Sequence, residues 1–218
     1  MYKYELLNGH YIIDIENKKY LLDTGCQESF CFKNNPSEVV IDNVKYTLSP
    51  NKLNPTQMKY THMLVDTKFD GFIGMDIIKQ TSLTIYKNGF IDFKAVDSEG
   101  MRLPLHTSLG YLFIDTSLGK YAIDTGAMFA YGTKELFSCV KPYTKCRDYN
   151  PSLGVLESDL YRLIIGVNNS ATFINICNNA KVQNTYLAMI QCDAIGNLTT
   201  FFDDICVLDV NKMELILK

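Results

Sequence analysis

Tyr20-Leu21-Leu22-Asp23-Thr24-Gly25 is the stretch that decides the fold, an apolar run that ends in Asp-Thr-Gly. A matching stretch, Tyr121-Ala122-Ile123-Asp124-Thr125-Gly126, follows at an offset of 124 − 23 = 101 residues. A given tripeptide is expected well under once in a chain of 218 residues, so two copies in one context indicate a repeated unit. In each copy the aspartate is predicted to lie at the end of a strand.

The repeat extends on both sides of these two stretches. Upstream, Gly9 and Gly110 each begin a hairpin that leads into the Asp-Thr-Gly strand, at the same offset of 101 residues (110 − 9). Downstream, 70–74 resembles 193–196, because in both an Asp precedes apolar residues and a glycine. A strand-turn-strand pattern then closes each copy, at 83–94 and at 207–218. We therefore predict two copies of one unit, each with one key aspartate.

The repeat predicts two lobes, 1–97 and 98–218, with the polar segment 95–100 between them. Short apolar runs rich in β-branched and aromatic residues, separated by turn residues, predict a mostly β fold. Short helical turns are expected at 75–80 and 134–137. In the first lobe, strands are expected at 10–15, 19–23, 28–32, 38–41, 44–48, 58–65, 72–74, 82–86 and 90–94. The second lobe is longer between its aspartate and its later glycine, and 139–151 is expected to form part of that addition.

Composition and charge exclude several classes of protein. A hydrophobic content of 47% and a charged content of 21% are ordinary for a globular protein. The net charge is −3 with no cluster of Lys and Arg, so no nucleic-acid partner is expected. No apolar run approaches the length of a membrane-spanning helix, so no membrane association is expected either.

The amino terminus and the cysteines favour the cytoplasm. The first residues lack the continuous apolar core of a signal peptide. The seven cysteines are odd in number and irregularly spaced, which favours reduced thiols. Cys26 and Cys31 have no second pair that would complete a zinc site, so we expect no metal and no cofactor.

Two aspartates related by a pseudo-twofold axis have a specific chemical use. Carboxylates roughly 3 Å apart cannot both ionise, so Asp23 and Asp124 would share a proton and titrate as a pair. The ionised member can then take a proton from water while the protonated member donates to a carbonyl oxygen. That chemistry adds water to an amide. The simpler reading is that both are turn formers, which the paired motifs disfavour.

The neighbouring residues suit such loops. Gly25 and Gly126 permit a sharp turn whose amides point at the carboxylates. The hydroxyls of Thr24 and Thr125 can satisfy buried backbone groups across the interface between lobes. A second strand could pass closely behind each loop at two further glycines, Gly74 and Gly196.

The doubled motif resembles the retropepsin-like and pepsin-like aspartic peptidases. The resemblance covers 9–94, 110–132 and 193–218, whereas 133–192 matches nothing in that family. It implies a two-lobed acid-protease fold in which each lobe is a closed β unit like one retropepsin subunit. Because both lobes would lie in one chain, the resemblance also implies a monomer. It also implies Asp23 and Asp124 as catalytic residues, interlocking threonines, and a peptide or protein substrate bound under a flap.

The resemblance has departures. Cys26 and Ala127 follow the two motifs, and the next positions are Gln27 and Met128 rather than the serine that pepsins have. Cys26 is expected to be a small buried residue beside the dyad, with a redox-sensitive thiol as the alternative. The flap candidate is the loop 49–56, which could equally be an ordinary exposed loop. The flap candidates in this loop are Ser49, Pro50, Asn51 and Lys52, and Tyr46 just before it could serve as a flap tyrosine.

Three functions therefore stand side by side. The first is an aspartic endopeptidase with Asp23 and Asp124 as the dyad. The second is a catalytically weak or inactive module of the same fold that binds peptides or proteins. A structural β-protein unrelated to proteolysis ranks third.

Overall fold

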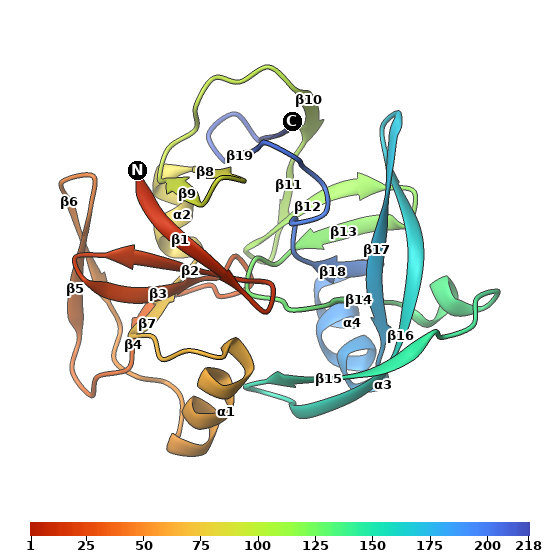
Figure 1. Ribbon diagram of the computed structural model, residues 1–218, viewed down its shortest axis with the longest axis horizontal. Coiled ribbons are helices and arrows are strands. Elements are labelled where there is room, and N and C mark those ends of the chain that lie inside the picture. The colour runs from red at the N-terminus through yellow and green to blue at the C-terminus, as the bar shows by residue number, and fades with distance from the viewer.

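The computed structural model describes all residues from 1 to 218, and the fold is mostly β, as predicted (Figure 1). The strands form sheets of ten, eight and two strands. No helix is long and apolar enough to cross a membrane.

The first half contains a hairpin-rich β unit with two helices. In chain order its elements are β1 (Tyr2–Leu7), β2 (His10–Ile15), β3 (Lys18–Leu22), β4 (Phe30–Cys31), β5 (Ser37–Ile41), β6 (Val44–Leu48), α1 (Pro55–Val65), β7 (Gly71–Ile73), α2 (Met75–Thr81), β8 (Leu83–Tyr86) and β9 (Phe90–Asp92). The strands β5 and β6 pair only with each other and form the two-stranded sheet.

The second half repeats the hairpins and closing strands of the first, but a long three-stranded insertion replaces β5, β6 and α1, and no helix corresponds to α2. Its elements are β10 (Met101–Pro104), β11 (His106–Ser108), β12 (Tyr111–Thr116), β13 (Gly119–Ile123), β14 (Ala130–Gly132), a 3₁₀ turn (Lys134–Phe137), β15 (Thr144–Asn150), β16 (Gly154–Val167), β17 (Ser170–Asn178), the consecutive helical turns α3 (Ala180–Val182), Gln183–Leu187 and α4 (Ala188–Ile190), β18 (Ala194–Gly196), β19 (Ile205–Asp209) and β20 (Glu214–Leu217). The segment 139–151, expected to form part of an addition, contains β15, and the addition continues through β16 and β17.

Strand pairing in the two halves has the same register. In the hairpin before each Asp-Thr-Gly loop, Tyr11 pairs with Leu22, and Leu112 pairs with Ile123. In each half the strand that carries the aspartate then pairs in parallel with a later strand, β3 with β7 and β13 with β18. The sequence repeat is therefore also a structural repeat.

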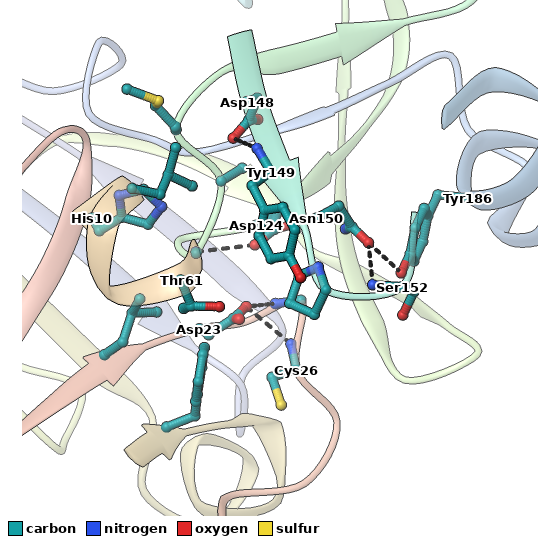
Figure 2. Close-up of a pocket in the computed structure, with 18 of the residues that line it drawn as sticks. His10, Asp23, Cys26, Thr61, Asp124, Asp148, Tyr149, Asn150, Ser152 and Tyr186 are labelled. Carbon is teal, nitrogen blue, oxygen red and sulfur yellow. Dashed lines mark hydrogen bonds between the residues drawn. The ribbon is translucent and has the colours of Figure 1, made fainter. Parts of the chain in front are cut away.

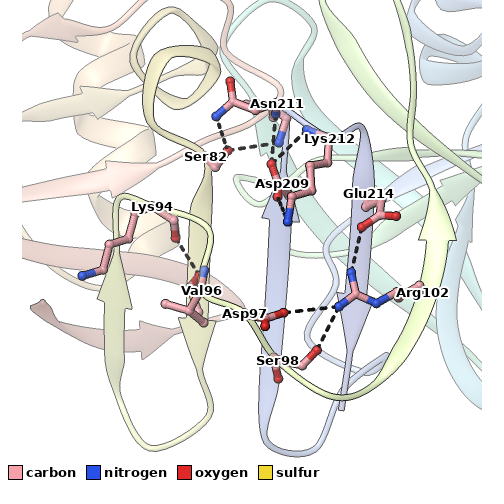
Figure 3. Close-up of polar contacts among 12 residues, drawn as sticks. Ser82, Lys94, Val96, Asp97, Ser98, Arg102, Asp209, Asn211, Lys212 and Glu214 are labelled. Atoms are coloured by element: carbon pink, nitrogen blue, oxygen red, sulfur yellow. Dashed lines mark hydrogen bonds and ion pairs between the residues drawn. The ribbon is translucent and has the colours of Figure 1, made fainter.

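The two halves share one sheet. Its central strands are β8 of the first half and β19 of the second, which pair antiparallel, with β9 and β1 on one side and β20 and β10 on the other. Figure 3 shows further polar contacts here, where the Val210 amide donates to Ser82 Oγ at 3.1 Å. Arg102 binds Glu214 at 2.8 Å and reaches Asp97 in the connecting segment at 3.5 Å. Main-chain hydrogen bonds therefore fix how the halves face each other.

One predicted strand is wrong, because 58–65 lies within the helix α1 (Pro55–Val65). Asn54 is the N-cap and its side chain accepts from the Gln57 amide, while the Gln57 side chain accepts from the Asn54 amide. Pro55 occupies the first helical turn, where its missing N–H costs nothing. This capping box starts a helix in a segment whose apolar residues had suggested a strand.

The other first-half predictions and the two helical turns agree with the structure. The turn expected at 75–80 is α2, and that expected at 134–137 is the 3₁₀ turn. The largest buried cluster of side chains draws on both halves, with Tyr20 and Leu22 packed in the same core as Tyr121 and Ile123. This common core holds the ends of β3 and β13 close together.

Candidate active site

The two Asp-Thr-Gly loops interlock at the ends of β3 and β13. The Thr24 amide donates to Thr125 Oγ1 at 3.0 Å, and the Thr125 amide donates to Thr24 Oγ1 at 2.9 Å. Each hydroxyl in turn donates to the carbonyl before the opposite aspartate, Thr24 to Ile123 O at 2.9 Å and Thr125 to Leu22 O at 3.0 Å. Both threonines are fully buried. The four bonds are reciprocal, so they impose local twofold symmetry on the loops.

This interlock places the two carboxyl groups side by side. A Cβ built on Gly25 would lie 2.7 Å from the carboxyl of Asp124, and one built on Gly126 would lie 2.6 Å from Asp23 Oδ1. Each acid therefore occupies space that only a glycine in the opposite loop leaves free. Each carboxyl group is close enough to the other to shift its pKa. The structure thus brings together Asp23 and Asp124, as well as the four flanking residues predicted from the sequence.

The two acids differ in their hydrogen bonds. Asp23 Oδ1 accepts from the amides of Gly25 at 2.8 Å and Cys26 at 3.0 Å. Asp124 Oδ1 accepts from the Gly126 amide alone, at 3.0 Å. Burial raises the pKa of Asp23, and these two amides partly offset that rise. Burial, followed by the charge of Asp23, raises the pKa of Asp124 well above its usual value. The anion is therefore better stabilised on Asp23, and the shared proton on Asp124.

A second strand passes behind each loop. The Asp23 amide donates to Ile73 O at 2.9 Å, and the Asp124 amide donates to Gly196 O at 2.8 Å. Gly196 is therefore equivalent to Ile73, and Gly74 is equivalent to Asn197. A Cβ on Gly74 would lie 2.6 Å from Cys26 O, so this glycine permits a close approach behind the first loop. In the second half the Asn197 side chain instead donates to Ala127 O at 2.9 Å.

A cavity of about 270 Å³ lies over the two acids. It is closed on the side away from the shared sheet by α1 of the first half and by the turn between β15 and β16 of the second (Figures 1 and 2). From α1 the lining residues are Thr61, Leu64 and Val65, and from the end of β15 and the turn after it they are the residues 149–152. We call these two segments the roof.

The two parts of the roof contact each other. The Gln57 side chain donates to Pro151 O at 2.6 Å. Tyr60 of α1 stacks on Tyr149 of β15, with ring centres 5.1 Å apart and planes inclined by 22°. Segments from opposite halves therefore meet over the acids.

The flap candidates lie elsewhere. Tyr46 packs against the main core, while Ser49 Oγ and Lys52 Nζ both contact Glu28. Asn51 and Pro50 also lie outside the cavity lining, which the first-half loop reaches only at Leu53. The covering element is instead α1, directly after that loop. Its signal in the sequence is Asn54-Pro55-Thr56-Gln57, a helix-starting capping box.

Sequence reasoning did not assign two polar residues to the cavity, His10 and Asp148. His10 is 3% exposed, and its Nδ1 lies 3.2 Å from Leu7 O. Asp148 is 8% exposed and accepts a 2.7 Å hydrogen bond from the Tyr131 hydroxyl. Figure 2 shows His10 and Asp148 beside the pair of acids. Because Asp148 belongs to the second-half insertion, nothing in the repeat could have indicated it.

Cys26 also lines the cavity, next to Asp23. Its thiol donates to Glu28 O at 3.2 Å. Burial, followed by the charge of Asp23, raises the pKa of this thiol to about 12. It is therefore a protonated, weakly reactive group at neutral pH.

Asp23 and Asp124 give the cavity one place where acid-base chemistry can occur, because the two acids can hold one proton between them. No three His, Cys, Asp or Glu side chains cluster in a way that could hold a metal ion. The chain matches no protein-family model, and no curated protein is significantly similar to it in sequence.

Proposed function

We propose that this protein is an aspartic endopeptidase with the two-lobed acid-protease fold, in which Asp23 and Asp124 form the catalytic dyad. The observation that carries the proposal is the reciprocal contact of each carboxyl with the glycine of the opposite loop. Two turn-forming aspartates would have no reason to meet in a shared cavity, each with a raised pKa.

The hydrogen bonds assign roles to the two acids. Asp23, which accepts from two amides, acts as the base that takes a proton from the attacking water. Asp124 holds the shared proton and donates it to the carbonyl oxygen of the scissile peptide bond. The water oxygen then bonds to the carbonyl carbon and gives a neutral gem-diol. Asp23 then gives the proton that it took from water to the amide nitrogen, while Asp124 takes a proton back from one hydroxyl of the gem-diol. The carbon–nitrogen bond breaks, a carboxylic acid and an amine leave, and one proton is again shared by the two acids.

An extended peptide would lie across the dyad between the two halves, held by backbone hydrogen bonds and by side-chain pockets on either side. Both acids come from one chain, so a monomer is sufficient. The roof would have to move for a long peptide to enter, because Gln57 and Pro151 are bonded across the cavity.

The test is hydrolysis of a mixed peptide library, followed by mass spectrometry from acidic to neutral pH. Wild type is expected to cleave, with inhibition by a statine-type compound that resembles the gem-diol. Asp23→Asn and Asp124→Asn should each lose at least about a thousandfold in rate, since either change removes the shared proton chemistry.

The matched control is Asp14→Asn, which removes an exposed carboxyl outside the cavity and should leave the rate unchanged. Cleavage that persists in both dyad variants would exclude this mechanism. Circular dichroism of each variant separates loss of chemistry from loss of folding.

A peptide-binding module without activity is the second candidate. The observation that favours it is the bonded roof over a cavity of about 270 Å³, which is below the usual ligand-site range of roughly 300–1,000 Å³. In that case wild type and Asp124→Asn would bind the same peptides with similar Kd, and neither would cleave them.

A further inference from the structure

The cavity has two chemically different ends, one in each half. On the first-half side it is lined by Leu21, Phe30 and Phe72, which belong to one apolar cluster. On the second-half side it is lined by residues of a separate cluster that includes Tyr111 and Tyr131. The two acids lie on the pseudo-twofold axis, between these ends.

Equivalent positions in the repeat explain the difference. Phe30 and Tyr131 are 131 − 30 = 101 residues apart and pair with equivalent strands, β7 and β18. Phe30 stacks on Phe72 with ring centres 4.6 Å apart. Tyr131 adds a hydroxyl at the corresponding place and donates it to Asp148 Oδ2 at 2.7 Å. The other oxygen, Oδ1, accepts from the Tyr149 amide at 2.7 Å.

Asp148 is buried without a cation. It forms no salt bridge, and the cavity lining contains no Lys and no Arg. The one nearby side chain that could become a cation is His10. Burial lowers its pKa, so it is neutral at neutral pH. Burial raises the pKa of Asp148, and its neutral donors offset only part of that rise, so a bound cation would stabilise the carboxylate.

The aromatic residues at this end of the cavity favour the same kind of ligand. Tyr111, Tyr131 and Tyr186 all line this end of the cavity. Aromatic faces next to a carboxylate attract alkylammonium and guanidinium groups. Asn150, whose side chain lies within 3.3 Å of the Tyr186 hydroxyl, adds a further polar group.

We propose that the Asp148 end of the cavity is a specificity pocket for a Lys or Arg side chain of the peptide, opposite an apolar pocket on the other side of the dyad. This inference rests on the proposed peptidase function for its substrate, but the pocket itself rests on the geometry around Asp148. Asp148 is the counter-charge, and Tyr131 positions it.

The first measurement uses wild type alone. Acetylated peptides are compared in pairs that differ only by Arg or its uncharged isostere citrulline, placed in turn at each position beside the scissile bond. One position should show a preference for Arg of about 30-fold or more in kcat/KM, the effect of one buried charge pair. Equal values for Arg and citrulline at every position would overturn the pocket.

Asp148→Asn keeps the size of the side chain and removes its charge. The Arg preference should then fall towards one, whereas Asp14→Asn, which removes an exposed carboxyl outside the cavity, should retain it. If Asp148→Asn retains the Arg preference, the assignment of Asp148 is wrong. Should this variant not fold, the wild-type comparison still decides.

A free peptide N-terminus is also an alkylammonium group, so a second set of peptides has a free amino terminus and no basic side chain. A preference for these over their acetylated forms, without an Arg effect, would overturn the side-chain assignment. Fluorescence anisotropy with Asp124→Asn separates the two proposals. Tighter binding of the Arg peptide without any cleavage by wild type keeps the pocket and removes the peptidase.

Discussion

The two halves build their Asp-Thr-Gly loops with the same register but cover them with different elements. The first half contributes the helix α1 (Pro55–Val65), and the second contributes the turn between β15 and β16. The shared part creates a symmetric interlock of Thr24 and Thr125, whereas the different parts create the asymmetric cavity. The symmetric loops therefore position the two acids, and the asymmetric covering elements determine the shape and chemistry of the cavity above them.

The largest effect is expected where the halves are most alike. Thr24→Val and Thr125→Val each remove a fully buried hydroxyl that makes two hydrogen bonds across the interface. Each change leaves a buried amide and a buried carbonyl unpaired, so the free energy of unfolding should fall by about 2–5 kcal/mol. Urea unfolding measures it.

Thr24→Ser and Thr125→Ser are the matched controls, because serine keeps the hydroxyl, and they should retain most of the stability. The double valine variant should cost less than the sum of the single changes, since the two threonines are direct partners. If the two single valine variants lose clearly unequal amounts of unfolding free energy, the two threonines do not contribute equally and the interlock is not energetically symmetric.

The next largest effect concerns the pH dependence of stability, in which Asp23 and Asp124 are expected to differ. The folded-state pKa of Asp124 is raised, so its contribution to stability is present below its unfolded value near 3.8 and is lost as pH rises through the folded value. Asn does not titrate. Asp124→Asn should therefore raise Tm at pH 7, by about 2–4 °C per kcal/mol regained, and the gain should shrink as pH falls towards 3.8.

Asp23→Asn should show the same sign with a smaller gain, because two amides already stabilise the Asp23 anion. Calorimetry of both variants across this pH range is the measurement. A larger gain for Asp23→Asn would reverse our assignment of base and acid. His10 lowers the pKa of Asp23 and the charge of Asp148 raises the pKa of Asp124, so both neighbours also favour the smaller gain for Asp23→Asn.

A smaller effect is expected at the contact between the two parts of the roof. Tyr60→Ala removes the stacking on Tyr149, which is worth about 0.5–1.5 kcal/mol. Opening should become more frequent, so KM for a long peptide should fall by about two- to tenfold. Tyr143→Ala, at a 58% exposed tyrosine, is the control and should leave KM unchanged.

Hydrogen exchange of the α1 amides provides a readout that does not depend on activity. Faster exchange in Tyr60→Ala than in Tyr143→Ala is expected if the stacking holds the roof closed. Identical exchange in both variants would mean that the stacking of Tyr60 on Tyr149 does not stabilise the contact between α1 and the β15–β16 turn. The two parts of the roof would then move independently.

The repeated parts could be predicted from the sequence because their signal is local. A strand, an Asp-Thr-Gly loop and a fixed offset of 101 residues between Thr24 and Thr125 are enough to place both acids at equivalent strand ends. The pairing of Gly74 with Gly196 failed by one position, because strand register, not the glycine itself, determines equivalence.

The covering elements could not be predicted in the same way. The helix α1 shows only a weak apolar face, with Thr61 and Val65 as its buried residues, so its N-terminal cap was the better signal. The β16–β17 hairpin does have a readable pattern, in which Leu163, Ile165 and Val167 are buried. That hairpin and β15, which carries Asp148, both lie outside the repeat, so no sequence offset could place Asp148 beside the acids.

The smallest effect is expected at Cys26, where the two loops differ by one side chain. Cys26→Ala gives the first loop the residue that the second has at Ala127. Because the thiol makes one hydrogen bond and its pKa is raised to about 12, it is neither a nucleophile nor a thiolate at neutral pH. Stability should change by less than about 1 kcal/mol, and the pH profile should not move. Peroxide should therefore inactivate wild type and Cys26→Ala at the same rate, and faster loss in wild type alone would show that the thiol controls the site.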